Sequence, residues 1–305
     1  MKKTIILLSL LFAHLVAQAQ LSELTFAQKL TEEHKQIKGT NFHLIMPEDY
    51  EMAGEFAGIT DGAASLLMFM KVPKNPDFSE ISTDDARKEM EKKGLKVTEI
   101  TRLKNVKGQP LVMTGSGKKG SIGMLQIMMN IPGSAWLVIG VFTDEDEKEE
   151  ILNCLKSLYI DAGKKIDLDK VRKFKIDLSG TDFKFDSYNG VFFQYISNGT
   201  KEAKLVRVVQ MPWSTLDGKS FKKFCEEQVQ RLTKEKDTEV IEKKAVKTKA
   251  GKGYCIITRK KGALTHTLYT GDGETLLMIY AKSDQPLRQS KKAFEKLLFK
   301  KISLK

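Results

Sequence analysis

An internal repeat at an offset of about 140 residues constrains this chain more than any other feature of its sequence. GTNFHL at 39–44 recurs as GTDFKF at 180–185, so that Phe42 matches Phe183. Three apolar positions of the segment that closes each copy also recur at one offset: Leu152, Leu155 and Ile160 match Phe294, Leu297 and Ile302. The sequence therefore predicts one fold built twice, with 20–161 as the first domain and 162–305 as the second.

Each copy combines helical stretches with short strand-like runs. The helical stretches lie at 82–94 and 218–232, and Ser82 with Asp85 predicts a capping box at the first of them. The strand-like runs are 97–106, 109–115, 121–131 and 134–142, matched by 239–247, 253–259, 262–270 and 275–283. Strands joined by short turns are antiparallel, and runs apolar on both sides predict a sheet covered on both faces. The predicted fold class is α+β: two tandem copies of an antiparallel sheet sandwiched between helices.

The glycine- and lysine-rich stretch TGSGKKGSIG at 114–123 is similar to a phosphate-binding loop, but it fails the pattern. Such a loop needs glycine where Val112 stands and Ser or Thr where Lys119 stands. RKKGAL at 259–264 falls at the same place in the second copy. The stretch therefore predicts a hairpin turn with lysines at a solvated tip and no nucleotide cofactor.

The first 19 residues predict a secretory signal peptide. Lys2 and Lys3 precede an apolar core at 5–13, and Ala17 and Ala19 fill the small-residue positions of a cleavage site before Gln20. No later stretch has the roughly 18 apolar residues of a membrane span. We therefore expect an exported protein, periplasmic or secreted, that is soluble after cleavage and has no transmembrane segment.

Three cysteines, Cys154, Cys225 and Cys255, give an exported chain an odd count. At least one thiol then stays free or bridges to another chain. Cys225 lies on an apolar helical face, which is typical of a small buried hydrophobe. A disulfide between Cys225 and Cys255 remains an open alternative, because sequence gives no distances.

The run GTNFHLIMPEDYE, the helical stretch after it, VKGQPLVMTGSGKKG and the closing helix resemble the PsbP-like (Mog/PsbP-like) superfamily. This group includes DcrB-like bacterial envelope proteins and a eukaryotic nuclear-transport factor that binds the GTPase Ran. The resemblance covers 35–161 and, more weakly, 174–304. It implies a protein that acts by binding other proteins, with no catalytic residues to carry over.

Catalytic motifs are missing from the sequence. Beyond the predicted signal peptide the histidines are His34, His43 and His266, and no H-E-x-x-H, G-x-S-x-G or C-x-x-C occurs. TDEDEKEE at 143–150 fails as a calcium loop, because Glu149 stands where glycine is required. We therefore predict that the protein is not an enzyme and has no cofactor.

Two methionine-rich runs, LLMFM at 66–70 and GMLQIMMN at 123–130, contain thioethers that can bind Cu(I). No His or Cys lies near them in the sequence. Leu125, Ile127 and Met129 alternate as one face of a strand should, so both runs are predicted to fill the core rather than hold a metal.

Charge differs sharply between the two copies. Residues 20–161 carry 17 Lys and Arg against 22 Asp and Glu, a net charge of −5, whereas 162–305 carry 32 against 17, a net charge of +15. Such asymmetry favours an anionic partner, or an acidic domain docked on a basic one. We do not expect nucleic acid as a partner of an exported chain.

Cations of the second copy gather at two consecutive hairpin turns: Lys247, Lys249 and Lys252 at the first, and Arg259, Lys260 and Lys261 at the second. The turns lie at opposite ends of one strand, about 20 Å apart. This exceeds the screening length of roughly 8 Å at physiological salt. We therefore expect two contacts along an extended anionic envelope surface or an acidic protein, not one small-anion site.

The favoured function is an exported, non-catalytic binding protein of two PsbP-like domains with an unknown partner. One alternative is an enzyme with His43 or His266 lining a cleft between the domains. Another is a small-ligand carrier, which requires a sizeable apolar pocket.

Overall fold

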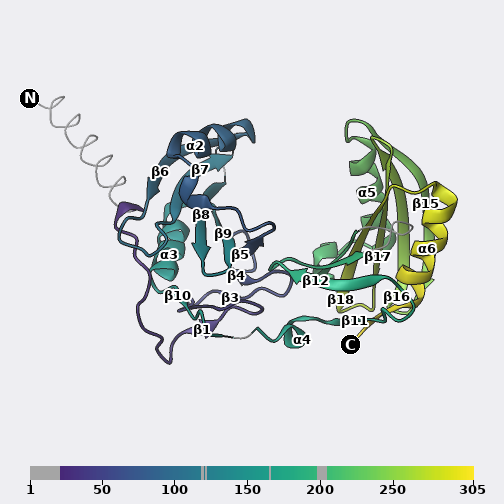
Figure 1. Cartoon of the computed structure of the whole chain (residues 1–305), viewed down its shortest axis with the longest axis horizontal. Coiled ribbons are helices and arrows are strands. Elements are labelled where there is room, and N and C mark those ends of the chain that lie inside the picture. The colour runs from purple at the N-terminus through teal and green to yellow at the C-terminus, as the bar shows by residue number, and fades with distance from the viewer. Residues whose placement is uncertain (1–20, 118–119, 121, 165, 198–204) are drawn as a thin grey trace, which may run out of the picture. The chain divides into compact units, whose positions relative to one another are not determined.

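The computed structural model describes residues 21–117, 120, 122–164, 166–197 and 205–305. They form two compact units, Met1–Ile166 and Asp167–Lys305 (Figure 1). The expected signal peptide at 1–19 lies outside the described residues. In the part of the chain that is described, no helix is long and apolar enough to cross a membrane.

The first unit is built on a seven-stranded antiparallel sheet with strand order β3-β4-β5-β9-β8-β7-β6. Its strands are β3 (Glu51–Met52), β4 (Gly58–Thr60), β5 (Leu66–Val72), β6 (Leu95–Arg102), β7 (Leu111–Gly117), β8 (Gly123–Ile131) and β9 (Ser134–Phe142). A second small sheet joins β1 (Lys35–Gln36), β2 (Phe42–Leu44) and β10 (Tyr159–Ile160). The helices are η1 (Phe78–Glu80), α2 (Thr83–Lys92) and α3 (Glu145–Lys156).

The second unit has a seven-stranded antiparallel sheet in the order β12-β13-β14-β18-β17-β16-β15. Its strands are β12 (Phe183–Tyr188), β13 (Phe192–Ser197), β14 (Leu205–Pro212), β15 (Thr238–Thr248), β16 (Gly251–Lys260), β17 (Ala263–Gly271) and β18 (Thr275–Ser283). The short strands β11 (Phe174–Ile176) and β19 (Ile302–Leu304) pair separately, and the helices are α4 (Leu168–Val171), η2 (Trp213–Leu216), α5 (Phe221–Thr233) and α6 (Leu287–Lys300). The two seven-stranded sheets follow the same order, so β14 and β18 hold the central places that β5 and β9 hold in the first.

Side-chain caps set the helix starts in the first unit. Ser82 accepts a hydrogen bond from the Asp85 amide at 3.1 Å, which confirms the serine half of the predicted capping box. The Asp85 carboxylate accepts from the Ser82 hydroxyl at 2.7 Å, and not from the Ser82 amide as a full capping box requires. α3 begins after Asp144, whose carboxylate accepts from the Glu147 amide at 3.0 Å. Acidic residues in the first turn of α3 also suit the positive end of the helix dipole.

The glycine- and lysine-rich stretch connects two antiparallel strands, as the sequence predicted. β7 and β8 pair up to Ser116 and Gly123, and the Gly117 amide donates to the Ile122 carbonyl at 3.1 Å. The stretch is therefore a hairpin rather than the start of a helix that could hold a phosphate. Lys118 and Lys119 lie outside the described residues.

The repeated Gly-Thr turn recurs in geometry as well as in sequence. Gly39 and Gly180 have φ of 76° and 63°, a left-handed conformation that suits glycine. The Thr40 and Thr181 hydroxyls each donate to the carbonyl three residues earlier, at 2.9 and 2.7 Å. The pairing around the turn differs, however. β10 pairs with β2, which follows its turn, whereas β19 pairs with β11, which precedes its turn.

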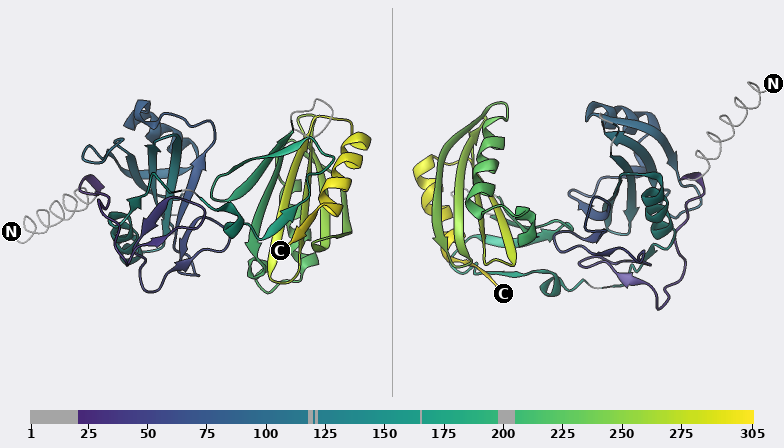
Figure 2. Two further views of the ribbon diagram at one scale, coloured as in Figure 1. Left: turned by 60° about the horizontal axis from the view of Figure 1, so that its bottom comes forward. Right: turned by 180° about the vertical axis from the view of Figure 1, so that it is seen from behind.

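The predicted class of a sheet sandwiched between helices is wrong, because both units consist mainly of antiparallel sheet. Among the described residues, one α-helix of 10 to 14 residues packs on each face of either large sheet. Figure 2 shows α5 and α6 on opposite faces of the second sheet. Extended segments supply much of the remaining cover: Leu21, Ile37 and Phe42 join α3 over the first sheet. The apolar residues on both sides of the strands indicated that both sheet faces are covered. They could not indicate that helices supply the cover, because an extended segment buries apolar area as well as a helix does.

Candidate functional site

Each histidine in the described part of the chain contacts other residues of its own unit. His266 is 1% exposed, its Nε2 lies 2.7 Å from the Ser290 hydroxyl, and burial lowers its pKa to about 4. Ser290 is itself fully buried, so this pair offers a substrate no access. His34 bonds through Nε2 to the Ser157 carbonyl at 2.8 Å, and burial lowers the pKa of His43 in β2.

All three cysteines are free and buried. Cys255 packs in the core beneath α6, whereas Cys225 on α5 packs against the other face of the same sheet. The alternative of a Cys225–Cys255 disulfide is therefore wrong, and the reading of Cys225 as a buried hydrophobe is confirmed. Burial raises the pKa of each thiol to about 12, so none is a ready nucleophile.

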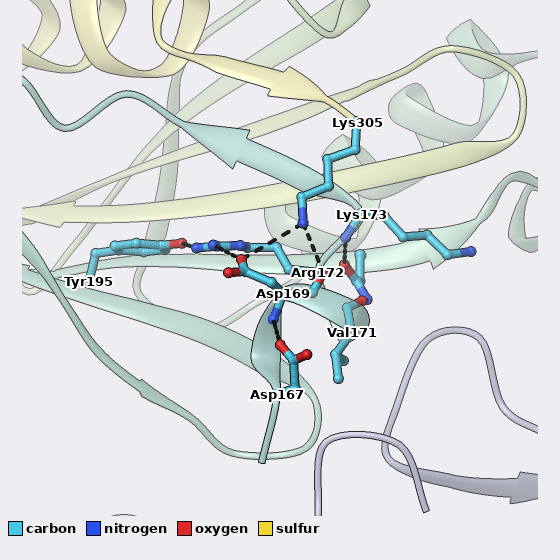
Figure 3. Close-up of polar contacts among 8 residues, drawn as sticks. Asp167, Asp169, Val171, Arg172, Lys173, Tyr195 and Lys305 are labelled. Carbon is cyan, nitrogen blue, oxygen red and sulfur yellow. Dashed lines mark hydrogen bonds and ion pairs between the residues drawn. The ribbon is translucent and has the colours of Figure 1, made fainter. Parts of the chain in front are cut away.

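A polar cluster around α4 joins the start of the second unit to its C-terminus (Figure 3). Arg172 donates from Nη2 to the Asp169 carboxylate and contacts the buried Tyr195 hydroxyl at 3.5 Å. Lys305 donates from Nζ to the Asp169 carbonyl at 2.8 Å. The hydrogen bond from Arg172 lowers the pKa of Asp169. The charged groups pair with one another, so the cluster fastens chain segments together.

Gln210 fixes the same segment to the second sheet. Its side-chain amide donates to the Val171 carbonyl at 2.8 Å and accepts from the Lys173 amide at 2.9 Å, and Gln210 is 5% exposed.

We expect Gln210→Ala to lower the free energy of unfolding by about 1.5 kcal/mol, because it leaves two backbone groups without partners. Urea denaturation measures this loss. Gln230→Ala, on the exposed side of α5, is the control, and its free energy of unfolding should stay within about 0.5 kcal/mol of the wild-type value. Equal losses in the two variants would show that the two hydrogen bonds of the Gln210 side chain do not contribute to stability.

The six cations singled out from the sequence are all exposed and lie at the two predicted hairpin turns. Lys247 and Lys252 are directly opposite each other on β15 and β16. At the other turn, Arg259 pairs with Glu239 at 3.0 Å and Lys260 with Glu235 at 2.9 Å. Lys249 and Lys261 complete the two groups. Their contact with an anionic surface stays a prediction.

In the part of the chain that is described, no group of three or more His, Cys, Asp or Glu side chains could hold a metal ion. A different feature of the first unit, an incompletely covered sheet face, is the better candidate for a site. α2 packs against β6 at one edge of this face (Figure 1). η1 contacts β8. Between these two contacts the outward residues of β5 and β9 are partly exposed.

Three rows of side chains make up this open face, which we call the methionine face. Strand register places Met68 beside Ile139 and Ile139 beside Gln126 in the middle row. The flanking rows are Leu66–Val141–Met124 and Met70–Leu137–Met128. Eight of these nine side chains are apolar and four are methionines. Seven of the nine are partly exposed, whereas Gln126 and Met128 are buried, at 7% and 9% exposure. Contiguous apolar surface that is left partly exposed is typical of a binding site.

A groove of about 460 Å³ borders the methionine face along α2. Gln126 and Met128 line it on the sheet side, and Lys88, Glu89 and Lys92 line it on the helix side. Gln126 is 7% exposed. The groove therefore combines an apolar floor, the Gln126 amide and a charged rim.

At equivalent positions of its sheet, the second unit carries charged and polar side chains where the first unit carries apolar ones. By strand order and register, Arg207 and Tyr280 stand where Met68 and Ile139 stand in the first unit. Lys282 stands in the place of Val141. The two sheets therefore share an order of strands but present different open faces.

The sequence analysis predicted that both methionine-rich runs fill the core, and the structure confirms this for some of their residues only. Leu125, Ile127 and Met129 are buried on the α3 side, as predicted. Met68 and Met70 instead point to the open face, while the intervening Phe69 is buried. A two-residue alternation was visible in the sequence, but it could not show which of two apolar faces lacks cover.

Comparison with known proteins gives weak structural likenesses. No protein-family model matches the chain, and no curated protein matches it. The apo immunity protein TplEi of T6SS from Pseudomonas aeruginosa aligns over 89% of this chain and 97% of its own, with 8% identity and a TM-score of 0.30. The same protein complexed with "L" peptide gives 90% and 98% coverage, 9% identity and a TM-score of 0.31. A chain of the Tle4–Tli4 complex gives 90% and 99%, 10% identity and a TM-score of 0.34. TM-scores this low do not establish a shared fold, and no family is established for the chain.

Proposed function

We propose that this chain is a non-catalytic binding protein that holds a protein partner on the methionine face of its first unit. The observation that carries the proposal is the apolar surface on β5, β9 and the start of β8, where seven apolar side chains of the three rows remain partly exposed. A protein that stays dispersed in water rarely leaves such a surface without a partner.

Methionine suits this role for a physical reason. Its unbranched, polarizable side chain adopts several shapes at low cost and adapts to different apolar partners. Met68, Met70 and Met124 are partly exposed, so a partner can reach them. An amphipathic helix, whose apolar stripe matches the width of a few strands, fits the face and the groove beside α2.

The proposal extends to location and ancestry. We propose that the protein is exported, as residues 1–19 predict, and that its two units are copies of one PsbP-like domain. The matching strand orders and the recurring Gly-Thr turns support the second statement. Contact of the two hairpin-turn clusters with an anionic envelope surface is a separate proposal and involves only the second unit.

Quantitative capture tests the binding role. We expect Ile139→Lys to reduce the amount of the main protein retained from an envelope extract by at least about tenfold, because it places a charge at the centre of the apolar face. Mass spectrometry with labelled standards compares the retained protein between variants. Met68→Gln, a milder change in the same row, should reduce retention by a smaller factor.

Leu30→Lys provides the matched control, since Leu30 is 48% exposed in the same unit and lies outside the three rows. It should leave retention within about twofold of wild type. Circular dichroism shows whether each variant is folded. Equal retention by the wild-type, Ile139→Lys and Met68→Gln proteins would refute the proposed site.

A further inference from the structure

The open face of the second sheet carries a guanidinium that the fold holds in place. Arg207 on β14 lies over the ring of Phe192, with its Cζ 4.5 Å from the ring centroid. Its Nε donates to the Gln194 side chain at 2.9 Å, and Gln194 in turn donates to Asp186 at 2.8 Å. A cation–π contact and an Nε hydrogen bond together fix the plane of the guanidinium.

The outer nitrogens of that guanidinium are available to a ligand. Nη1 and Nη2 of Arg207 have no hydrogen-bond partner within the described residues, and the side chain is partly exposed. These two nitrogens form the fork that binds a carboxylate through two parallel hydrogen bonds. The Asp186 carboxylate is engaged by Gln194 and Ser187 rather than by Arg207.

A second cation stands at a defined spacing from Arg207. Arg207 pairs with Tyr280 across the sheet, so Lys282, two residues further along β18, is its diagonal neighbour. Diagonal neighbours in an antiparallel pair lie about 7–8 Å apart. Side chains at alternate positions of an extended peptide point the same way and lie about 6.7 Å apart. The two spacings match.

We propose that Arg207 and Lys282 form a binding site for an extended acidic peptide segment with carboxylates at alternate positions. Nη1 and Nη2 of Arg207 bind one carboxylate through two hydrogen bonds, and the ammonium group of Lys282 forms an ion pair with the next carboxylate. Lys184, on the same side of the sheet in the row of Lys282, adds to the positive potential. This site lies in the second unit and does not depend on the methionine face.

Fluorescence anisotropy tests the site, with a labelled peptide of alternating glutamate and serine as the probe and the chain from Gln20 as the protein, at low salt. Arg207→Gln should weaken peptide binding by about tenfold, the usual effect of losing a charge-assisted bidentate pair. Arg207→Lys should weaken it by a smaller factor, since the charge remains and the fork is lost. Arg288→Gln is the matched control, because it removes the same charge from an exposed position on α6, which covers the opposite face of the sheet, and it should change the affinity by less than about twofold.

Two further arms identify the ligand chemistry. The same peptide with glutamine in place of glutamate should not bind, and inorganic phosphate should not displace the acidic peptide at equal concentration. The site is overturned if the wild-type protein does not bind the acidic peptide at millimolar concentration, or if Arg288→Gln weakens binding as much as Arg207→Gln. Displacement by equimolar phosphate, or equal binding of the glutamine peptide, also overturns it.

Discussion

Lowering the pH from 7 to 4.5 should reduce the stability of the second unit by about 2.5 kcal/mol more in the wild-type protein than in a His266→Gln variant. His266 of β17 is buried beneath α6, where its ring centroid lies 4.6 Å from that of Phe294, at an interplanar angle of 43°, and its Nε2 bonds to Ser290. Burial lowers its pKa to about 4, against an ordinary value of 6.5. The folded state therefore resists protonation that the unfolded chain accepts.

The sign of this effect follows from the direction of the pKa shift. Above pH 6.5 His266 is neutral in both states, so its burial brings no pH-dependent penalty. As the pH falls below 6.5 the unfolded chain binds a proton first, and stability is lost progressively until the pH reaches about 4. Other groups titrate equally in both proteins and cancel in the comparison.

Native-state hydrogen exchange of the β17 and β18 amides reports the second unit alone. The free energies of opening in the two proteins should diverge between pH 7 and pH 4.5, with the wild type losing more. Parallel pH profiles would mean that His266 is protonated in the folded state and that its burial does not control acid stability.

Phe42→Ala should reduce the free energy of unfolding of the first unit by about 3–5 kcal/mol. Phe42 is fully buried, and its ring centroid lies 5.0 Å from that of Phe69 and 4.9 Å from that of Trp136. Truncation removes the apolar contact area, leaves a cavity and breaks the edge-to-face contact with Trp136.

Hydrogen exchange of the β5 and β9 amides, which flank this ring cluster, measures the loss. Leu30→Ala is the control, because Leu30 is 48% exposed and should change stability by less than about 0.5 kcal/mol. A loss below about 1 kcal/mol for Phe42→Ala would place Phe42 outside the core that holds this unit together.

Much of the fold could be predicted because its signals are local. The Ser82 cap, the hairpin at 114–123 and the Gly-Thr turns depend on residues within a few positions of one another. Phe42 and Phe183, which match in the sequence repeat, are both buried. Such features need no knowledge of distant parts of the chain.

The cover of the sheets and the candidate sites could not be predicted in this way. Met68 and Phe69 are both apolar, and only distant packing decides which of them is left partly exposed: Phe69 is buried against Phe42 on the α3 side, whereas Met68 lies on the opposite face. Arg207 and Lys282 are 75 residues apart in the sequence and become neighbours only because β14 pairs with β18. Neither segment alone predicts the register of that pairing. Sequence reasoning instead selected the hairpin lysines, which stand out as runs of like charge.

Site-specific photo-crosslinking tests most directly whether the methionine face is the binding surface. A photo-reactive benzoylphenylalanine in place of Ile139, at the centre of the face, should form an adduct of discrete mass with a protein partner in cells that export the chain. The same residue in place of Lys292, on the exposed side of α6, should not form that adduct. Absence of any adduct at 139, or the same adduct at both positions, would contradict the proposed role of the methionine face.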